Sequence, residues 1–409
     1  MVIIDYFKLF DMKTLKNNFI LMLSLLIAFL SSCKVDALSP LEKNTNAPSP
    51  VSNVNYTAGP GNALITYASP TDKDLLYVKA VYTLANGRVM EVKSSYYGNN
   101  LTVEGFGDTE EHEVKLYAVN RSEIASAPVS IKVKPLENPI WEVYRSMKAL
   151  ADFGGLRFTA KNTAQADLAI EILTEDSKGR LVPTTKNIYT STIDIDQAIR
   201  GYDPIARKFA ITIRDRWLNY SDTLFTTLTP LYEAAIPKSG YKAVTLPSDV
   251  ALHTATALAN LWDGDLLNWP RVLMTSSAVL TPQWITFDIG KVSALSRIVI
   301  WDYPEYLNGR TYFYGGNLLD FEIWGTDNPP ADGSFTNWTK LGTFKAKKPS
   351  GAAYGANTTE DLAAGAAGLN FTFDAGIPKV RYLRIRSIKN WQGTTFMAIG
   401  ELQVYGDPR

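Results

Sequence analysis

From residue 51 onward, the chain is a succession of short apolar segments with few signs of helix. Segments such as 63–67, 75–83 and 113–119 are rich in Val, Leu, Ile and Tyr, and clusters of Gly, Pro, Asn and Asp separate them. Short apolar runs bounded by turn residues are typical of β-strands. A helical period is visible only in 249–260. The sequence therefore predicts an all-β protein, and its 409 residues are enough for about two or three domains.

Two parts of the chain end in the same pattern. In each, an alternating strand is followed by a polar turn, a serine and a last strand, so that residues 118–120 correspond to 213–215. Their separation of about a hundred residues is the length of one β-sandwich domain. The pattern predicts tandem sandwiches over 51–134 and 135–232. A third domain over 233–409 is distinguished by frequent Trp and long loops.

The first sandwich resembles a fibronectin type III domain. The segment PVSNVNYTAGPGNALITYASPTDKDLLYVKAVYT has that family's opening proline, its second strand and the proline after that strand. The segment HEVKLYAVNRSEIASAP resembles the sixth strand and its turn. Two positions depart from the family: Tyr67 stands where it usually has Trp, and His112 stands where its corner tyrosine lies.

The last domain resembles the discoidin, or coagulation factor C-type, domain. Five phrases carry the resemblance in order: LWDGDLLNW, PQWITFDIGKVSALSRIVIW, FEIWGTDNP, WTKLGTF, and RYLRIRSIKNWQG followed by IGELQVYG. The resemblance implies a galactose-binding-like jelly roll. The implied fold class is thus all-β, with tandem fibronectin type III-like sandwiches followed by a jelly roll. This fold carries many different binding functions.

The start of the chain resembles a bacterial lipoprotein signal. A positively charged flank precedes the apolar run 19–30, and small residues lead to Cys33, the only cysteine. An apolar run of about a dozen residues is too short for a stable membrane span. The resemblance implies a signal peptide over 1–32, a diacylated Cys33 and a tether over 33–50. The alternative is an ordinary signal peptide followed by a stray cysteine.

Charge and domain order bear on the class of function. Lys plus Arg and Asp plus Glu number 41 each, so the net charge gives no reason to expect a nucleic-acid partner. A lipoprotein signal, two sandwiches and a discoidin-like domain together resemble surface lipoproteins of bacterial glycan-utilisation loci. That resemblance implies an outer-membrane location facing the cell exterior, a polysaccharide or oligosaccharide ligand and contact with importer proteins.

An acidic loop in the third domain matches a metal site of the discoidin family. The resemblance implies structural calcium held by Asp263, Asp265 and the backbone of Leu261, with Glu401 returning to the loop. Carboxylates and carbonyls suit this hard cation, and Gly264 permits the sharp turn. The alternative is a plain Asp-Gly turn with solvated carboxylates.

The long connection 302–317 is the candidate ligand site. It carries Tyr303, Tyr306 and Arg310, and Trp391 on a later loop is expected to complete a wall. Sugar recognition needs an aromatic face and a few planar donors and acceptors. The alternative is that aromatic residues of this loop, above all those at 312–314, pack beneath it as a small core of its own.

Catalysis finds little support in the sequence. His112 and His253 fall in different predicted domains, and neither lies in a recognised hydrolase or metalloprotease motif. We therefore expect a non-enzymatic surface lipoprotein that captures polysaccharide through its last domain. The rival expectation is an adhesion or scaffolding protein that binds a protein or another envelope component.

Overall fold

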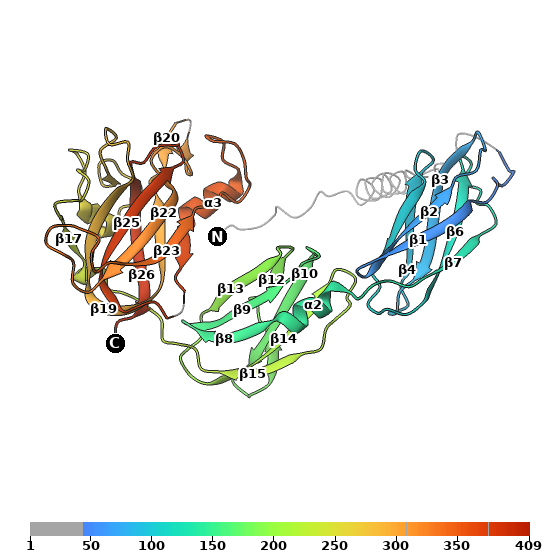
Figure 1. Ribbon diagram of the computed structural model, residues 1–409, viewed down its shortest axis with the longest axis horizontal. Helices are drawn as coiled ribbons and strands as arrows, with labels where there is room; N and C mark the ends of the chain where they lie inside the picture. Colours follow the sequence, from blue (N-terminus) through green and yellow to red (C-terminus); the bar gives the residue numbers. More distant parts are fainter. Residues whose placement is uncertain (1–43, 308, 375) are drawn as a thin grey trace, which may run out of the picture. The chain divides into compact units, whose positions relative to one another are not determined.

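The computed structural model describes residues 44–307, 309–374 and 376–409 (Figure 1). The predicted signal peptide and Cys33 lie outside the described residues. The chain divides after Asn138 into two compact units. In the described part of the chain, no helix has the length and apolar character needed to cross a bilayer.

The first unit is a sandwich of two antiparallel sheets, as the fibronectin-like pattern predicts. Alternate residues of each strand face inward, so Ala63, Ile65 and Tyr67 of β2 are buried while Leu64 and Thr66 are exposed. One sheet has the strand order β1–β2–β5 and the other β4–β3–β6–β7. The strands are β1 (Ser52–Gly59), β2 (Asn62–Ala68), β3 (Leu75–Thr83), β4 (Val89–Ser95), β5 (Asn100–Glu104), β6 (His112–Asn120) and β7 (Val129–Val133).

The two positions that depart from the fibronectin pattern have different surroundings. Tyr67 is buried in the core, where the family usually has Trp. The ring of His112 stacks on Phe106, with centroids 4.4 Å apart, and its Nε2 lies 2.7 Å from Oδ1 of Asp108. His112 therefore bonds to a side chain four residues upstream at the corner position.

The second sandwich pairs a three-stranded sheet, β13–β9–β8, with the sheet β11–β10–β14–β15, in which β12 also pairs with β10. Ile170, Ile172, Ile211 and Ile213 face the core between them, and a short helix covers one side of that core. The elements are α2 (Pro139–Ser146), β8 (Lys148–Asp152), β9 (Gly155–Lys161), β10 (Leu168–Glu175), β11 (Leu181–Pro183), β12 (Ile188–Thr190), β13 (Asp194–Arg200), β14 (Arg207–Asp215) and β15 (Leu224–Leu228).

The repeat seen in the sequence corresponds to the same turn in both sandwiches. In the first, the backbone N–H of Ala118 donates to Oγ of Ser126 over 3.0 Å. In the second, the N–H of Ile213 donates to Oγ of Ser221 over the same 3.0 Å. The predicted equivalence of 118–120 and 213–215 is therefore confirmed.

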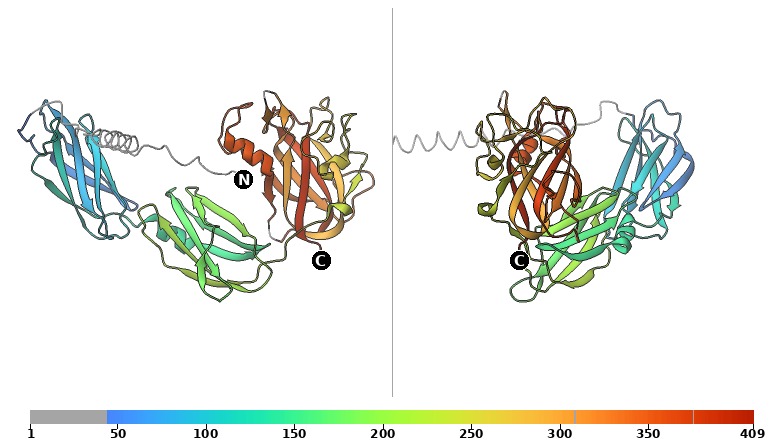
Figure 2. Two further views of the ribbon diagram at one scale, coloured as in Figure 1. Left: turned by 180° about the vertical axis from the view of Figure 1, so that it is seen from behind. Right: turned by 60° about the vertical axis from the view of Figure 1, so that its left-hand side comes forward.

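The last part of the chain is a jelly roll, seen from several sides in Figures 1 and 2. Its main strand path is β16–β26–β19–β25–β22–β23, with β17 and β24 paired to β19 and β18 paired to β26. The elements are β16 (Ala234–Ala235), η1 (Lys238–Gly240), β17 (Lys242–Val244), η2 (Leu258–Trp262), β18 (Leu273–Met274), β19 (Gln283–Asp302), β20 (Glu305–Tyr306), β21 (Arg310–Thr311), β22 (Leu318–Thr326), β23 (Thr339–Lys345), α3 (Thr359–Ala367), β24 (Leu369–Thr372), β25 (Val380–Asn390) and β26 (Ala398–Asp407).

Strand β19 joins the two sheets of the jelly roll. Residues 283–288 pair with β25, whereas residues 294–302 pair with β26. Gly290 lies at the change of sheet with φ 84°, and a Cβ there would meet the carbonyl oxygen of Gly240 at 2.7 Å. Only glycine fits that corner without strain.

The helical period noted over 249–260 is misleading. Only η2, a short 3-10 helix, forms at its end. The Asp249 carboxylate accepts a hydrogen bond from Thr286, and the N–H of Val250 donates to the Trp284 carbonyl. These bonds hold the segment against β19 in place of helical bonds. Helix α3, which begins with a capping box between Thr358 and Asp361, was also not predicted from the sequence.

Candidate ligand-binding end of the jelly roll

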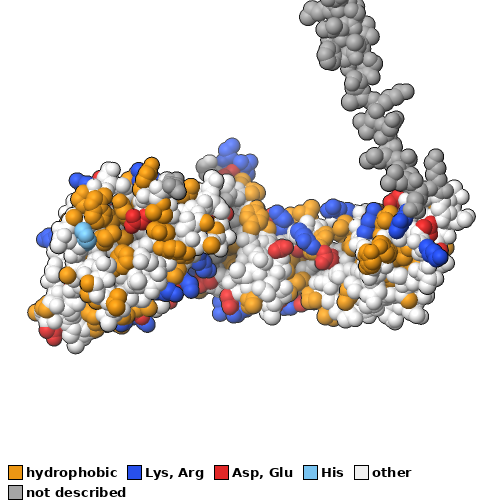
Figure 3. Space-filling view, turned by 90° about the horizontal axis from the view of Figure 1, so that it is seen from above, with side chains coloured by type: hydrophobic (Ala, Val, Ile, Leu, Met, Phe, Trp, Pro, Cys, Tyr) orange, Lys and Arg blue, Asp and Glu red, His pale blue; other side chains and the backbone are white. Residues whose placement is uncertain are grey.

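Exposed aromatic side chains gather at one end of the jelly roll. The Trp269 ring lies 5.5 Å from the His253 ring and 6.4 Å from the Tyr303 ring, measured between centroids. These residues come from three separate loops. Trp269 is 48% exposed, and Figure 3 shows hydrophobic side chains collected over the jelly roll as seen from above. We call His253, Trp269, Tyr303 and Tyr306 the aromatic surface.

A small hairpin extends this surface beyond Tyr303. Its strands β20 and β21 place Tyr306 directly opposite Arg310, and Tyr306 is 78% exposed. Burial raises the pKa of Tyr303, the Glu305 carboxylate raises it further, and the Arg310 guanidinium opposes both effects. Both Glu305 and Arg310 therefore lie close enough to the Tyr303 phenol to affect its pKa. The structure thus brings three of the four predicted ligand residues together.

The fourth predicted ligand residue, Trp391, has another role. Its ring packs edge-on against buried Phe313, with centroids 5.5 Å apart, and it borders the main core of the jelly roll. Its backbone N–H donates to the carbonyl of Asn317, so its turn closes the base of the long loop. Tyr312 is buried beside Phe313. Trp391 therefore belongs to the packing beneath the loop, the alternative weighed for its aromatic residues.

The first residue of the long loop is a buried acid. Asp302 is 3% exposed, its Oδ2 has no hydrogen-bond partner among the described residues, and burial raises its pKa to about 7. A hydrogen bond from the Phe313 backbone opposes that rise. Burial also raises the pKa of Glu305 nearby. Both acids therefore have an environment that favours the neutral form.

The predicted calcium residues do converge on one place. The Glu401 Oε2 accepts the N–H of Gly264 over 2.9 Å, which ties β26 to the loop after η2. Oδ1 of Asp263 accepts the N–H of Asp265 over 2.8 Å. Asp265 in turn accepts bonds from Asn268, and these bonds lower the pKa of Asp265. Leu261 is fully buried in the core.

Two basic side chains pair with the three carboxylates of this acidic loop. The Lys238 ammonium donates to Oε1 of Glu401. The Arg271 guanidinium lies 2.9 Å from Asp263 Oδ2 and 3.4 Å from Asp265 Oδ2. Burial raises the pKa of Glu401, whereas Lys238 lowers it.

These contacts bear on whether calcium fits the loop. Calcium requires carboxylate and carbonyl oxygens turned toward one point. Here the three carboxylates accept hydrogen bonds from N–H groups and from cationic side chains. In the described chain, no group of three or more Asp, Glu, His or Cys side chains is arranged to hold a metal ion. The donors as placed do not fit a calcium ion. Calcium binding itself stays a prediction that only a measurement tests.

Sequence reasoning missed two members of the aromatic surface. Trp269 entered only as the last residue of the phrase LWDGDLLNW, and His253 only as a histidine outside any recognised motif. The available signal was a Trp directly before Pro270 in a turn-rich segment, a position where a large apolar ring has no strand to pack in. Its proximity to Tyr303 arises from long-range folding and has no local signature.

Three family models match the chain in succession. Residues 48–135, 136–239 and 262–406 each match a different family that is described only as a domain of unknown function. No curated protein matches.

The chain is also similar to several solved structures. A SusE-like protein is 29% identical, covers 66% of this chain over 100% of its own length and has a TM-score of 0.42. A family 32 carbohydrate-binding module bound to GalNAc is 15% identical. The match covers 40% of this chain and 95% of the module's chain, with a TM-score of 0.26. A two-domain fibronectin type III segment of chicken tenascin is 11% identical, covers 44% and 99%, and has a TM-score of 0.20.

Proposed function

We propose that this protein is a non-catalytic surface lipoprotein that binds polysaccharide through the aromatic surface of its jelly roll. The observation that carries the proposal is the exposure of Trp269 and Tyr306 on two loops that both lie close to Tyr303. Large rings left open to solvent cost hydration free energy unless a ligand covers them. Flat rings beside Arg310 and Glu305 suit the apolar face and the hydroxyl groups of a sugar.

The surface is open, so we expect weak binding at each site. Many copies held on one membrane by acylated Cys33 would raise the overall affinity for a long polymer. We place the protein on the outer membrane facing outward, where it would pass polysaccharide to importer proteins. Mass spectrometry of the mature N-terminus tests the anchor, and a mature start other than lipidated Cys33 would contradict it.

An enzymatic role would need a general acid, and the geometry disfavours Asp302 for that role. A carboxyl with a raised pKa, such as that of Asp302, often marks a general acid. Asp302 is buried beneath the loop, however, so a bound sugar would not contact it. Binding without chemistry therefore accounts better for this end of the domain.

The proposal is tested by affinity electrophoresis of the mature chain in gels that contain single polysaccharides. We expect retardation by at least one polymer, loss of retardation in Trp269→Ala and Tyr306→Ala, and no change in the control Tyr97→Ala. Tyr97 is an 83% exposed tyrosine of the first unit. Retardation that survives both substitutions would move the site elsewhere. No retardation in any polymer would favour the adhesion or scaffolding role.

A further inference from the structure

A row of four side chains crosses the outer face of the second sandwich. β12 and β14 place Tyr189 and Arg214 on either side of Ala169 in β10, and an isolated bridge adds Tyr220 beyond Arg214. The adjacent residues of β10 and β14 point into the core, so strand alternation directs the row toward solvent. Tyr189 is 71% exposed and Tyr220 is 48% exposed.

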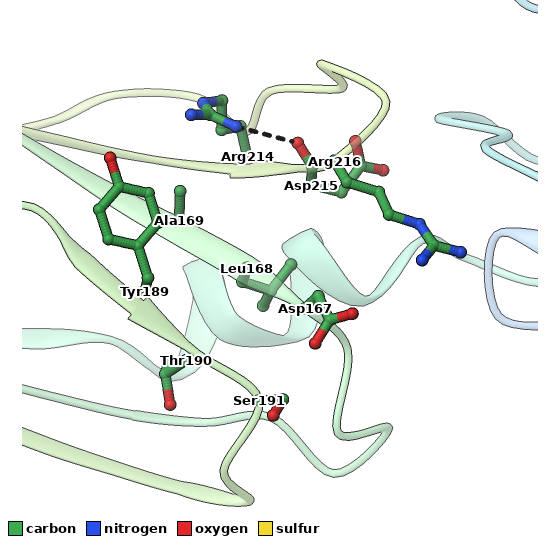
Figure 4. Close-up of a pocket in the computed structure, with 9 residues that line it drawn as sticks. All are labelled: Asp167, Leu168, Ala169, Tyr189, Thr190, Ser191, Arg214, Asp215 and Arg216. Carbon is green, nitrogen blue, oxygen red and sulfur yellow. Dashed lines mark hydrogen bonds between the residues drawn. The ribbon is translucent and has the colours of Figure 1, made fainter. Parts of the chain in front are cut away.

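The row forms a depression because its second member is small. The Ala169 methyl group is the floor between the ring of Tyr189 and the longer side chain of Arg214 (Figure 4). The hollow has a volume of about 380 Å³. Polar groups of Ser191 and Asp167 lie at its other end, as Figure 4 shows. An aromatic wall, an apolar floor and a polar rim are thus combined within one small area.

Arg214 is held in a fixed and electrically balanced position. Its Nε donates to Oε1 of Glu171 over 2.5 Å, and its Nη1 donates to the carbonyl of Asp215 over 3.4 Å. Its Nη2 has no acceptor among the described residues. A guanidinium bonded along one edge keeps its remaining N–H groups in a known plane. Because Glu171 balances its charge, Arg214 offers hydrogen bonds without an unpaired positive charge.

The first sandwich shows that the backbone does not require these side chains. It contains the same serine-closed turn, but Val119 and Ala125 stand opposite each other where the second sandwich has Arg214 and Tyr220. The turn therefore forms equally well without an arginine or a second tyrosine. The turn therefore does not need the exposed ring of Tyr220 in order to form.

We propose that this row is a second carbohydrate site, which binds a neutral oligosaccharide laid across the strands. Neighbouring strands are about 4.8 Å apart, so four positions span about 14 Å, the length of about three sugar rings. Tyr189 and Tyr220 would contact sugar faces at the two ends, and Arg214 with Glu171 would bond to hydroxyls between them. The site lies on a different domain from the aromatic surface and goes beyond the function proposed for that surface.

The test is hydrogen exchange of the mature chain with neutral hexasaccharides built from glucose, mannose, xylose or galactose. We expect at least one of them to protect peptides covering 186–191 and 212–221. The double variant Tyr189→Ala/Tyr220→Ala should weaken that binding by about tenfold or more. The control Phe225→Ala, a 69% exposed residue of β15 outside the row, should leave it unchanged.

The outcomes separate this site from the one on the jelly roll. No protection of 186–191 and 212–221 by any hexasaccharide, or protection that survives the double variant, would overturn the second site. Protection restricted to 265–271 and 303–311 would overturn it too and leave the proposed function intact. Protection of the row alone would support this inference and count against the aromatic surface.

Discussion

The two acidic loops of the jelly roll hold their carboxylates in opposite ways. In the loop after η2, Asp263 and Asp265 face Arg271, and Glu401 faces Lys238. In the loop after β19, Asp302 is buried without a basic partner in the described chain, and burial alone raises the pKa of Glu305. In the first loop every carboxylate has a basic partner, whereas in the second Glu305 lies next to exposed Tyr306 and Asp302 is buried beneath the loop. The difference is consistent with a structural role for the first loop and with the binding role that we propose for the second.

The largest expected effect concerns Asp302, the buried acid that has no basic partner in the described chain. The Asp302 pKa of about 7 lies above its ordinary value of 3.8, so the folded state binds more protons than the unfolded state between these values. Stability should therefore fall as pH rises from about 4 to above 7, by up to about 4 kcal/mol. Asp302→Asn should stabilise the protein at pH 8 and have little effect at pH 4. Urea unfolding at the two pH values measures this, and an equal effect at both would contradict it.

Removing Lys238 should be the next largest effect. Lys238→Met leaves the buried Glu401 carboxylate without its cation, which costs about 3 kcal/mol of unfolding free energy. Lys238→Arg is the matched control because it keeps the charge. The double variant Lys238→Met/Glu401→Gln should recover part of the loss. Should Lys238→Met and Lys238→Arg unfold at the same urea concentration, the ion pair would have no structural role.

Only the features that local sequence patterns encode could be predicted from the sequence. Strand alternation and turn residues predicted the sandwiches, and the resemblance to the discoidin domain implied the jelly roll. The connection 302–317 was expected as one loop that carries Tyr303, Tyr306 and Arg310, and the structure adds a short hairpin that pairs Tyr306 with Arg310. Lys238 was missed as a partner of the acidic loop because its ion pair with Glu401 joins residues 163 positions apart. Trp391 was misjudged for a related reason, since its contact with Phe313 depends on how two loops fold together.

A smaller effect is expected within the binding loop itself. Tyr306 is exposed, so Tyr306→Ala should change unfolding free energy by no more than about 0.5 kcal/mol. Phe313 is fully buried beneath the same loop, and Phe313→Ala should cost about 3 kcal/mol. Denaturant melts of both variants provide the measurement. A large loss in Tyr306→Ala would mean that its ring packs against the domain, and the proposed ligand surface would lose its most exposed member.

The smallest expected effect is that of calcium on the natural chain. Because Lys238 and Arg271 already pair with the carboxylates of the acidic loop, a chelator or excess calcium should leave the melting temperature unchanged within about 1 °C. The double variant Lys238→Met/Arg271→Met frees the same carboxylates, which suit calcium chemically. Millimolar calcium should stabilise that variant by about 1 kcal/mol through mass action. A fall in the melting temperature of the natural chain on chelation would instead show that the loop binds calcium. Lys238 and Arg271 would then lie beside the bound ion and would not replace it.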